Sequence, residues 1–461
     1  MYPAGAKRTV HVLWSSRKMF VLAAAGAVIG FNNFWEFPSL VLTYGGGAFL
    51  IVYLAFLLLL GLPLMAAEFM IGRVGRDAPD GAFRRTAVLV RARRSWWIVG
   101  AMAVLGGFFI FSYLSVIAGW TIAFGLRAIT GVFVGLTADG VASVFTQFVR
   151  DPEKQIFWYT LFIVSIVVVS ARGVRIGPER VIRYAVPTMF GLIGVLLLYA
   201  MVSGGFLRAL ADTFTPDFSK MSWTGVLAAA SQVFFSLGLG AGAMFMYGAY
   251  LERDAPLLRL TWAVAAIDTL AGVVATVTIY ALVYAGGVEP ATGPALLFQA
   301  LPLTFDYLPF GRFVLFLFFI TLILAAWLSA LALFEPAVMW LVERFHWHRP
   351  RAASLCGGVA WLLACVTALS FNSWAFSFRF FEETKKFGLF DVIQLATHQI
   401  LLPVVGICTA LFAGWALRSN FVRDELRLRW SVMFACWQWL VRIAIPVTLV
   451  CVMSQLSKLY A

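Results

Sequence analysis

The sequence predicts an all-α integral membrane protein, and three observations support that fold class. Of its 461 residues, 62% are hydrophobic and 12% are charged, whereas soluble domains are about 45–50% apolar and about 25% charged. Mean hydropathy is +0.90. The apolar stretches are long and continuous, unlike the alternating strands of an outer-membrane β-barrel. A soluble enzyme, a disordered chain and a collagen-like chain are therefore excluded.

Eleven apolar stretches are long enough to cross a membrane, because a spanning helix needs about 20 residues to cross roughly 30 Å of hydrocarbon. We expect these spans at residues 14–43, 47–73, 96–127, 155–171, 184–204, 223–252, 259–286, 310–343, 352–370, 391–417 and 437–457. They leave no room for a sizeable soluble domain, so residues 1–461 are expected to form one transmembrane domain.

Lysine and arginine are distributed unevenly over the predicted loops. The loop after the second span is strongly basic, and most other basic residues fall on the same side as the N-terminus. The positive-inside rule then predicts a cytoplasmic N-terminus and, with an odd number of spans, an outside C-terminus. This distribution accounts for the net charge of +13 without a nucleic-acid partner. The first stretch is too long for a cleaved signal peptide and contains Glu36, so we expect it to remain as a span.

Four longer segments are predicted to connect spans on the outside, at residues 128–154, 205–222, 287–309 and 371–390. Segment 287–309 is too apolar for a solvated connector, so we expect a re-entrant or lid-like hairpin there. The five cysteines form neither a CxxC nor a Cys/His ligand pattern, which argues against a disulfide framework and a zinc site. The HExxH, GxSxG and GxxxxGK[ST] motifs are absent, so nothing favours a membrane enzyme.

Two spans contain residues that disfavour a continuous helix. The first reads AGAVIGFNNFWEFP from Ala25 to Pro38, and the sixth reads FFSLGLGAGAMFMYGAY from Phe234 to Tyr250. Each glycine costs about 1 kcal/mol relative to alanine inside a helix. Unpaired backbone groups at membrane depth occur only where they line a cavity or are buried in protein. Close helix packing through small residues is the alternative for a single such helix.

The two breaks lie five spans apart, which is the spacing expected of an inverted repeat of five plus five helices. We therefore predict a first repeat at 14–205, a second at 223–418, an extra helix at 437–457, and a binding site between the broken helices.

The same segments resemble the neurotransmitter:sodium symporters. The stretch NNFWEFPSLVLTYGGGAFLIVYLAFLLLLGLPLMAAEFMIGR, from Asn32 to Arg73, is similar to the signature of that family's first two helices. The sixth span resembles the family's sixth helix, and FDVIQLATHQILLPVVG, from Phe390 to Gly406, resembles the tenth helix of bacterial members. The resemblance covers essentially the whole chain.

This resemblance implies a LeuT-like fold in a bacterial inner membrane. It also implies a sodium-coupled symporter that moves an amino acid or related small organic solute by alternating access, with no organic cofactor. A solute-binding sensor, or a homologue whose sodium coupling is altered or lost, is the alternative.

The resemblance assigns two sodium sites. The first would use the Val28 carbonyl and the side chains of Asn33, Ser236 and Asp268. The second would use the carbonyls of Gly26, Ile29 and Ala325 and the hydroxyl of Ser329. Leu328 departs from the Thr or Ser expected at the second site, so one oxygen ligand is missing there and coupling to a single sodium is expected.

The carboxylate of Asp268 stands where many members have Asn, and an ionisable residue inside a span is a functional candidate. Tyr53, Gln232 and Ser236 match chloride-site positions of the family. Chloride-dependent, chloride-free and proton-coupled transport therefore all stay open.

By the same resemblance, the substrate pocket lies between the broken helices and the third and eighth spans. Its expected residues are Val28, Phe31, Asn32, Ile110, Leu114, Phe235, Ser236, Gly238, Ala241, Ser329 and Leu333. Phe235 would close over the solute. Leu114 and Asn32 replace a Tyr and a Gly that bind the substrate carboxylate, and Gly30 replaces the Asp of monoamine carriers.

The outer gate also departs from the family pattern. Glu36 and Gln394 stand where members pair an Arg with an Asp, so a hydrogen bond would replace an ion pair. Glu36 would make the vestibule more negative, unless Arg379, Lys385 or Lys386 pairs with it locally. Glu68 keeps its family identity and is expected to tie to the unwound segments.

Overall fold

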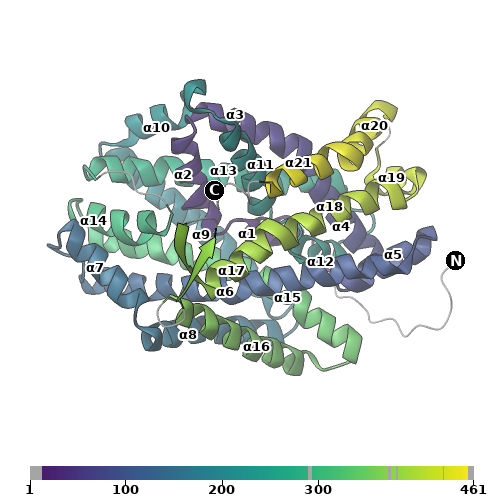
Figure 1. Cartoon of the computed structure of the whole chain (residues 1–461), viewed down its shortest axis with the longest axis horizontal. Coiled ribbons are helices and arrows are strands. Elements are labelled where there is room, and N and C mark those ends of the chain that lie inside the picture. Colours follow the sequence, from purple (N-terminus) through teal and green to yellow (C-terminus); the bar gives the residue numbers. More distant parts are fainter. Residues whose placement is uncertain (1–12, 289–292, 372–374, 381–382, 429, 455–461) are drawn as a thin grey trace.

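The computed structural model describes residues 13–288, 293–371, 375–380, 383–428 and 430–454 (Figure 1). Its first half contains α1 (Arg17–Val28), η1 (Phe31–Asn33), α2 (Glu36–Thr43), α3 (Gly47–Phe56), η2 (Leu57–Gly61), α4 (Leu62–Gly75), α5 (Pro79–Val90), η3 (Arg94–Trp96), α6 (Trp97–Thr130), α7 (Ala138–Val149), α8 (Pro152–Ala171), α9 (Pro178–Val202), α10 (Phe206–Phe214) and η4 (Phe218–Lys220). Its second half contains α11 (Trp223–Ser236), α12 (Ala243–Ala249), α13 (Leu257–Ala285), η5 (Leu296–Ala300), α14 (Leu301–Asp306), α15 (Gly311–Phe345), α16 (Arg349–Ser370), β1 (Ala375–Phe380), β2 (Glu383–Gly388), α17 (Leu389–Leu395), η6 (Ala396–Leu401), α18 (Leu402–Leu411), η7 (Phe412–Ala416), α19 (Ser419–Leu426), α20 (Ser431–Trp439), η8 (Leu440–Ala444) and α21 (Ile445–Met453).

The long apolar helices follow the predicted spans. Within the described residues, nine helices are long and apolar enough to cross a membrane, and α1 with η1 and α2 forms a tenth span bent by 69°. The interrupted pair α11 and α12 occupies the predicted sixth span. The prediction of an all-α membrane fold with broken first and sixth spans is confirmed, whereas the two repeats stay a prediction.

Several predicted boundaries were wrong at charged helix ends. The fifth span begins at Pro178 rather than at 184, and the eleventh begins at Ser431 rather than at 437. Proline suits the first turn of a helix because its missing N–H would be unpaired there anyway. The charged residues Glu179 and Arg180 of this first turn lower the local hydropathy without ending the helix.

Segments predicted as plain connectors contain short helices. Helix α5 lies in the basic loop after the second span, α7 and α10 lie in two of the outside segments, and α19 follows the tenth span. Helix α7 has its own N-cap residue, Thr137, whose side chain accepts a hydrogen bond from the Gly140 N–H. Short helices of mixed polarity are missed by a search for long apolar stretches.

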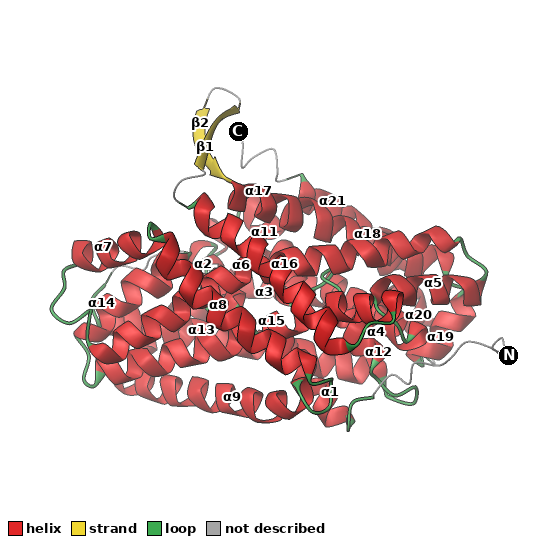
Figure 2. Cartoon of the chain, turned by 90° about the horizontal axis from the view of Figure 1, so that it is seen from below, coloured by secondary structure: helices red, strands yellow, loops and turns green. Residues whose placement is uncertain are grey.

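The last two outside segments also differ from expectation. Over its described part, segment 287–309 is the short helix η5–α14 rather than a hairpin. Segment 371–390 contains the antiparallel hairpin β1–β2, which projects from the helical body beside α17 (Figure 2). The alternation of Phe376, Phe378 and Phe380 is the sequence signal for this strand.

The helices that will carry the site are packed tightly against one another. Helix α6 lies along α15, α1 contacts α9, α13 and α15, and α12 packs against α4 (Figure 1). A Cβ added at Gly72 would lie 1.9 Å from the Phe245 carbonyl oxygen, so only glycine allows this approach of α4 to α12. The broken spans are therefore held in the middle of the bundle by continuous helices.

Candidate functional site

The first interrupted span ends one helix and begins another at the centre of the bundle. Helix α1 stops at Val28, and a short 3-10 turn precedes α2. The N–H of Gly30 donates to the Asn33 side-chain oxygen, with 3.1 Å between nitrogen and oxygen. Val28 is the last residue of α1, and carbonyls at a helix end lack intrahelical partners. This break therefore offers oxygen atoms to a cation.

The second interruption depends on three alternating glycines. Gly238, Gly240 and Gly242 have φ of +60°, +76° and +85°, a left-handed conformation that glycine adopts without steric cost. The Gly240 N–H donates to Glu68 Oε1 over 2.8 Å, and Glu68 is fully buried in α4. The expectation that Glu68 ties to an unwound segment therefore holds for the sixth span.

Three predicted ligands of the first sodium site meet between the two breaks. Asn33 donates from Nδ2 to Asp268 Oδ1 over 2.9 Å, and the Ser236 hydroxyl donates to Asp268 Oδ2 over 2.7 Å. Asp268 is 0% exposed, and Asn33 and Ser236 are also buried. The arrangement brings polar side chains of the first and sixth spans onto one carboxylate of the seventh.

The second predicted sodium site is partly filled by hydrocarbon. The Ser329 hydroxyl donates to the Ala27 carbonyl over 2.9 Å and reaches the Ile29 carbonyl at 3.4 Å. Leu328 is buried, and a Cβ placed on Gly26 would lie 3.4 and 3.7 Å from its two methyl carbons. The side chain at 328 thus supplies methyl groups, and no oxygen, next to Gly26.

A cavity of about 780 Å³ lies between the broken spans and α6, α15, α17 and η6. All eleven predicted substrate residues line it, and so do both predicted gate residues. Glu36 and Gln394 share this cavity, but no hydrogen bond joins their side chains in the described part of the chain. Gly293 and Pro294 also line it, so segment 287–309 reaches the cavity although it is not a hairpin.

The charged groups lining the cavity are acidic. Glu36 and Asp391 are lining residues, and no Lys or Arg is among the described residues that line it. The alternative that Arg379, Lys385 or Lys386 pairs with Glu36 concerns side chains outside the described part of the structure. The described lining therefore carries acidic side chains and no basic one.

The polar and aromatic lining residues that sequence reasoning missed include Trp35, Tyr113, Asp391 and His398. The ring of Trp35 stacks on Phe31, with centroids 5.4 Å apart. The usable signal for His398 was its position within an apolar span, where ionisable side chains are rare and tend to be functional. Its partner in α6 is 285 residues away in sequence, so no local pattern reveals the pair.

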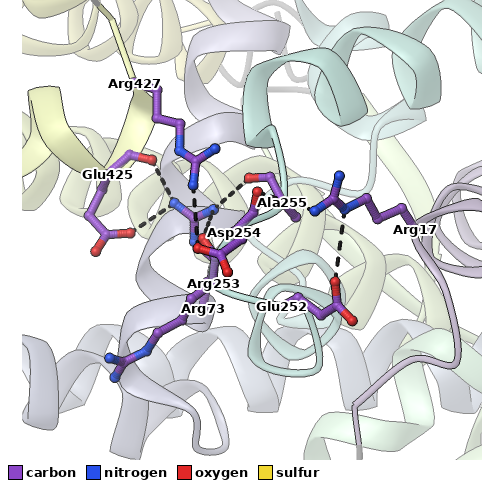
Figure 3. Close-up of polar contacts among 8 residues, drawn as sticks. All are labelled: Arg17, Arg73, Glu252, Arg253, Asp254, Ala255, Glu425 and Arg427. Atoms are coloured by element: carbon purple, nitrogen blue, oxygen red, sulfur yellow. Dashed lines mark hydrogen bonds and ion pairs between the residues drawn. The ribbon is translucent and has the colours of Figure 1, made fainter.

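Away from the cavity, Arg73 joins the end of α4 to α19 and to the loop after α12 (Figure 3). It is 2% exposed and donates to Glu425 Oε2 over 2.8 Å and to the Ala255 carbonyl over 3.1 Å. Arg17, at the start of α1, lies 3.8 Å from Glu252 of the same loop. At one face of the bundle, these contacts hold the start of α1 and the loop after α12, which are ends of the two broken spans.

A membrane fold with two interrupted spans, buried oxygen ligands at the breaks and a cavity between them is that of a secondary transporter. Residues 12–134 and 149–460 match the Sodium:neurotransmitter symporter family. The chain therefore belongs to the sodium:neurotransmitter symporter family, and sodium is its coupling ion.

Relatives and a solved structure agree with this assignment over nearly the whole chain. The uncharacterized sodium-dependent transporter YhdH of Bacillus subtilis is 28% identical, covering 96% of this chain and 97% of its own. The uncharacterized sodium-dependent transporter MJ1319 of Methanocaldococcus jannaschii is 30% identical over 95% and 89% of the two chains. The crystal structure of MhsT in complex with L-phenylalanine has a TM-score of 0.85 and 35% identity, covering 96% of this chain and 99% of MhsT.

Proposed function

We propose that this protein couples inward sodium movement to uptake of a neutral or cationic amino acid, or of a closely related solute. The observation that supports this most directly is that the ion cluster, which we define as Asn33, Ser236 and Asp268, adjoins the solute cavity. Ser236 lines the cavity and also donates to Asp268. A sodium ion held by Asn33, Ser236 and Asp268 would therefore adjoin the solute, so that binding of one favours binding of the other.

The substrate class is supported by the cavity and by the likeness to MhsT, whose structure contains L-phenylalanine. The cavity has apolar walls, including Ile110, Leu114 and Leu333, and its lining carboxylates belong to Glu36 and Asp391. Apolar walls with a few polar groups are typical of small-molecule sites. An ammonium group near these carboxylates and an apolar side chain against the walls would both be accommodated.

Uptake into proteoliposomes tests this function. Radiolabelled L-phenylalanine, L-leucine and L-lysine should accumulate with an inward sodium gradient and fail to accumulate when potassium replaces sodium. Binding of a solute with no accumulation under any gradient would favour the sensor instead. The methyl groups of Leu328 beside Gly26 are the feature that favours altered coupling.

We further propose a bacterial inner membrane location with a cytoplasmic N-terminus, because the basic loops cluster on that side. On this orientation, the Arg73 contacts close the cytoplasmic side, and the hairpin β1–β2 lies outside. Labelling of single cysteines introduced into α5 and α10 from one side of intact cells distinguishes the two orientations.

A further inference from the structure

His398 places a polar ring in the wall of the solute cavity. It lies in η6, inside the tenth span, and it lines the cavity together with Tyr113 and Phe235. Neither the sodium cluster nor the predicted gate uses it. A histidine at this depth requires partners, because an unpaired polar group is costly in an apolar environment.

Its partners come from two other spans. Nε2 of His398 shares a hydrogen bond with the Tyr113 hydroxyl of α6. The imidazole also stacks on the ring of Phe235 in α11, with centroids 4.7 Å apart and planes 28° from parallel. The histidine ring therefore joins the third, sixth and tenth spans at the cavity wall.

Further rings extend this contact along the wall. Tyr113 meets Phe390 edge-on with centroids 5.7 Å apart, and Phe390 packs against Phe371 at 5.0 Å. Five rings in contact line the cavity, and we call them the ring cluster: Phe235, His398, Tyr113, Phe390 and Phe371. The hydrogen bond between Tyr113 and His398 is the polar connection within the ring cluster, and the other ring contacts are apolar.

We infer that Tyr113 and His398 act as one hydrogen-bonded unit that fixes the ring of Phe235 and thereby sets the preference of the cavity between aromatic and aliphatic amino acids. This inference rests on the proposed function. Stacking holds the imidazole only weakly, whereas the hydrogen bond to Tyr113 adds a second attachment that fixes the ring against which Phe235 packs. Phe235 and Ser236 both line the cavity, and Ser236 also donates to Asp268.

A purely structural role makes a different prediction. If the pair only packed the helices, its loss would lower the stability of the protein and reduce its affinity for every solute by the same factor. If the pair positions Phe235, its loss changes the ratio of two affinities, because solutes of different shape use the space beside that ring differently. The ratio is therefore the informative measurement.

The test compares several variants with the unmodified protein in detergent with saturating sodium. Tyr113→Phe removes only the hydroxyl, His398→Phe keeps a stacking ring without the hydrogen bond, and the double variant removes both partners. Tyr159→Phe is the matched control, because it removes one buried hydroxyl from α8, and Tyr159 does not line the cavity. The measured quantity is the ratio of the Kd values for L-phenylalanine and L-leucine.

We expect each single variant to change this ratio by roughly 3- to 10-fold, which corresponds to one hydrogen bond. The double variant should change it no further, because both substitutions break the same bond. Tyr159→Phe should leave the ratio unchanged. His398→Gln, which keeps a hydrogen-bonding group but not the ring, should not restore it, because Phe235 would lose its stacking partner.

Unchanged ratios in Tyr113→Phe and His398→Phe, or effects that simply add in the double variant, would overturn the inference. These outcomes leave the proposed function intact, because sodium-dependent binding persists in them. If the unmodified protein bound no amino acid in the presence of sodium, that result would contradict the proposed function itself. Tyr113→Phe is a single-oxygen deletion, so it remains testable even if the His398 variants do not fold.

Discussion

Asn33 in the broken first span donates a hydrogen bond to Asp268 in α13, with 2.9 Å between Nδ2 and Oδ1. The bond links a segment that must rearrange in an alternating-access cycle to a continuous helix. It also orients a fully buried carboxylate towards Ser236 of the sixth span. A cation entering between these side chains would replace hydrogen bonds by ion contacts and draw the three spans together.

The first prediction is that sodium binding depends on Asp268. Asp268→Ala should abolish the sodium-dependent rise in melting temperature, because the cluster loses its charge and two oxygen ligands. A bound ion stabilises by about 2.7 kcal/mol at one hundred times its Kd, which a thermal-shift titration with sodium chloride against choline chloride detects. Asp139→Ala in α7, an exposed carboxylate, is the control. Retained sodium dependence in Asp268→Ala would contradict the assignment.

A single coupled sodium is the second prediction. Leu328 presents methyl carbons next to Gly26, and a buried cation without a full oxygen shell is costly. The sodium dependence of uptake should therefore have a Hill coefficient near one. Leu328→Thr should raise it, whereas Leu331→Thr, another buried leucine of the same helix, should not. A coefficient of about two in the unmodified protein rules out this reading.

The third prediction concerns solute charge. Glu36 and Asp391 line the cavity without a described Lys or Arg among the lining residues. Charges about 4 Å apart interact by roughly 4 kcal/mol at an effective dielectric constant of about 20. Unlabelled leucine and lysine should therefore inhibit uptake of a labelled solute more strongly than glutamate does. Glu36→Gln should narrow this difference, and Asp139→Asn should leave it unchanged. Competition by glutamate alone is the opposite result.

Glu68 provides the fourth prediction. Its Oε1 accepts from the Gly240 N–H, and both residues are buried. Glu68→Ala would leave this donor unpaired at a cost of about 1–3 kcal/mol, visible as a lower midpoint of unfolding in detergent. Glu68→Gln keeps an acceptor oxygen, so it should retain most of the stability. Equal destabilisation by both variants would show that the carboxylate acts in some other way.

Sequence alone revealed the parts of the site that depend on local chemistry. The glycines at 238, 240 and 242 identified the sixth-span break, because few other residues favour left-handed backbone. The polar Asn32 and Asn33 within an apolar stretch identified the break in the first span. Resemblance to the family then identified eleven cavity residues, since homologous positions occupy equivalent places in one fold. Helices α5 and α10 were missed because they are short and of mixed polarity.

Contacts between distant spans were beyond sequence reasoning. The Tyr113–His398 pair depends on how α6 and η6 pack, and neither segment carries a pattern that specifies its neighbour's register. For the same reason, the structure was needed to find that Asp391 lines the cavity.

The three left-handed glycines differ in how freely natural variation can act on them. A Cβ at Gly240 would lie 2.8 Å from the Leu402 carbonyl oxygen, whereas a Cβ at Gly238 would have no atom within 4 Å. Gly238 also lines the cavity. Asparagine tolerates left-handed backbone better than other side chains do. A single substitution at position 238 can therefore reshape the solute cavity without displacing neighbouring atoms. Solute selectivity can thus diverge among related transporters at this position while the fold is kept.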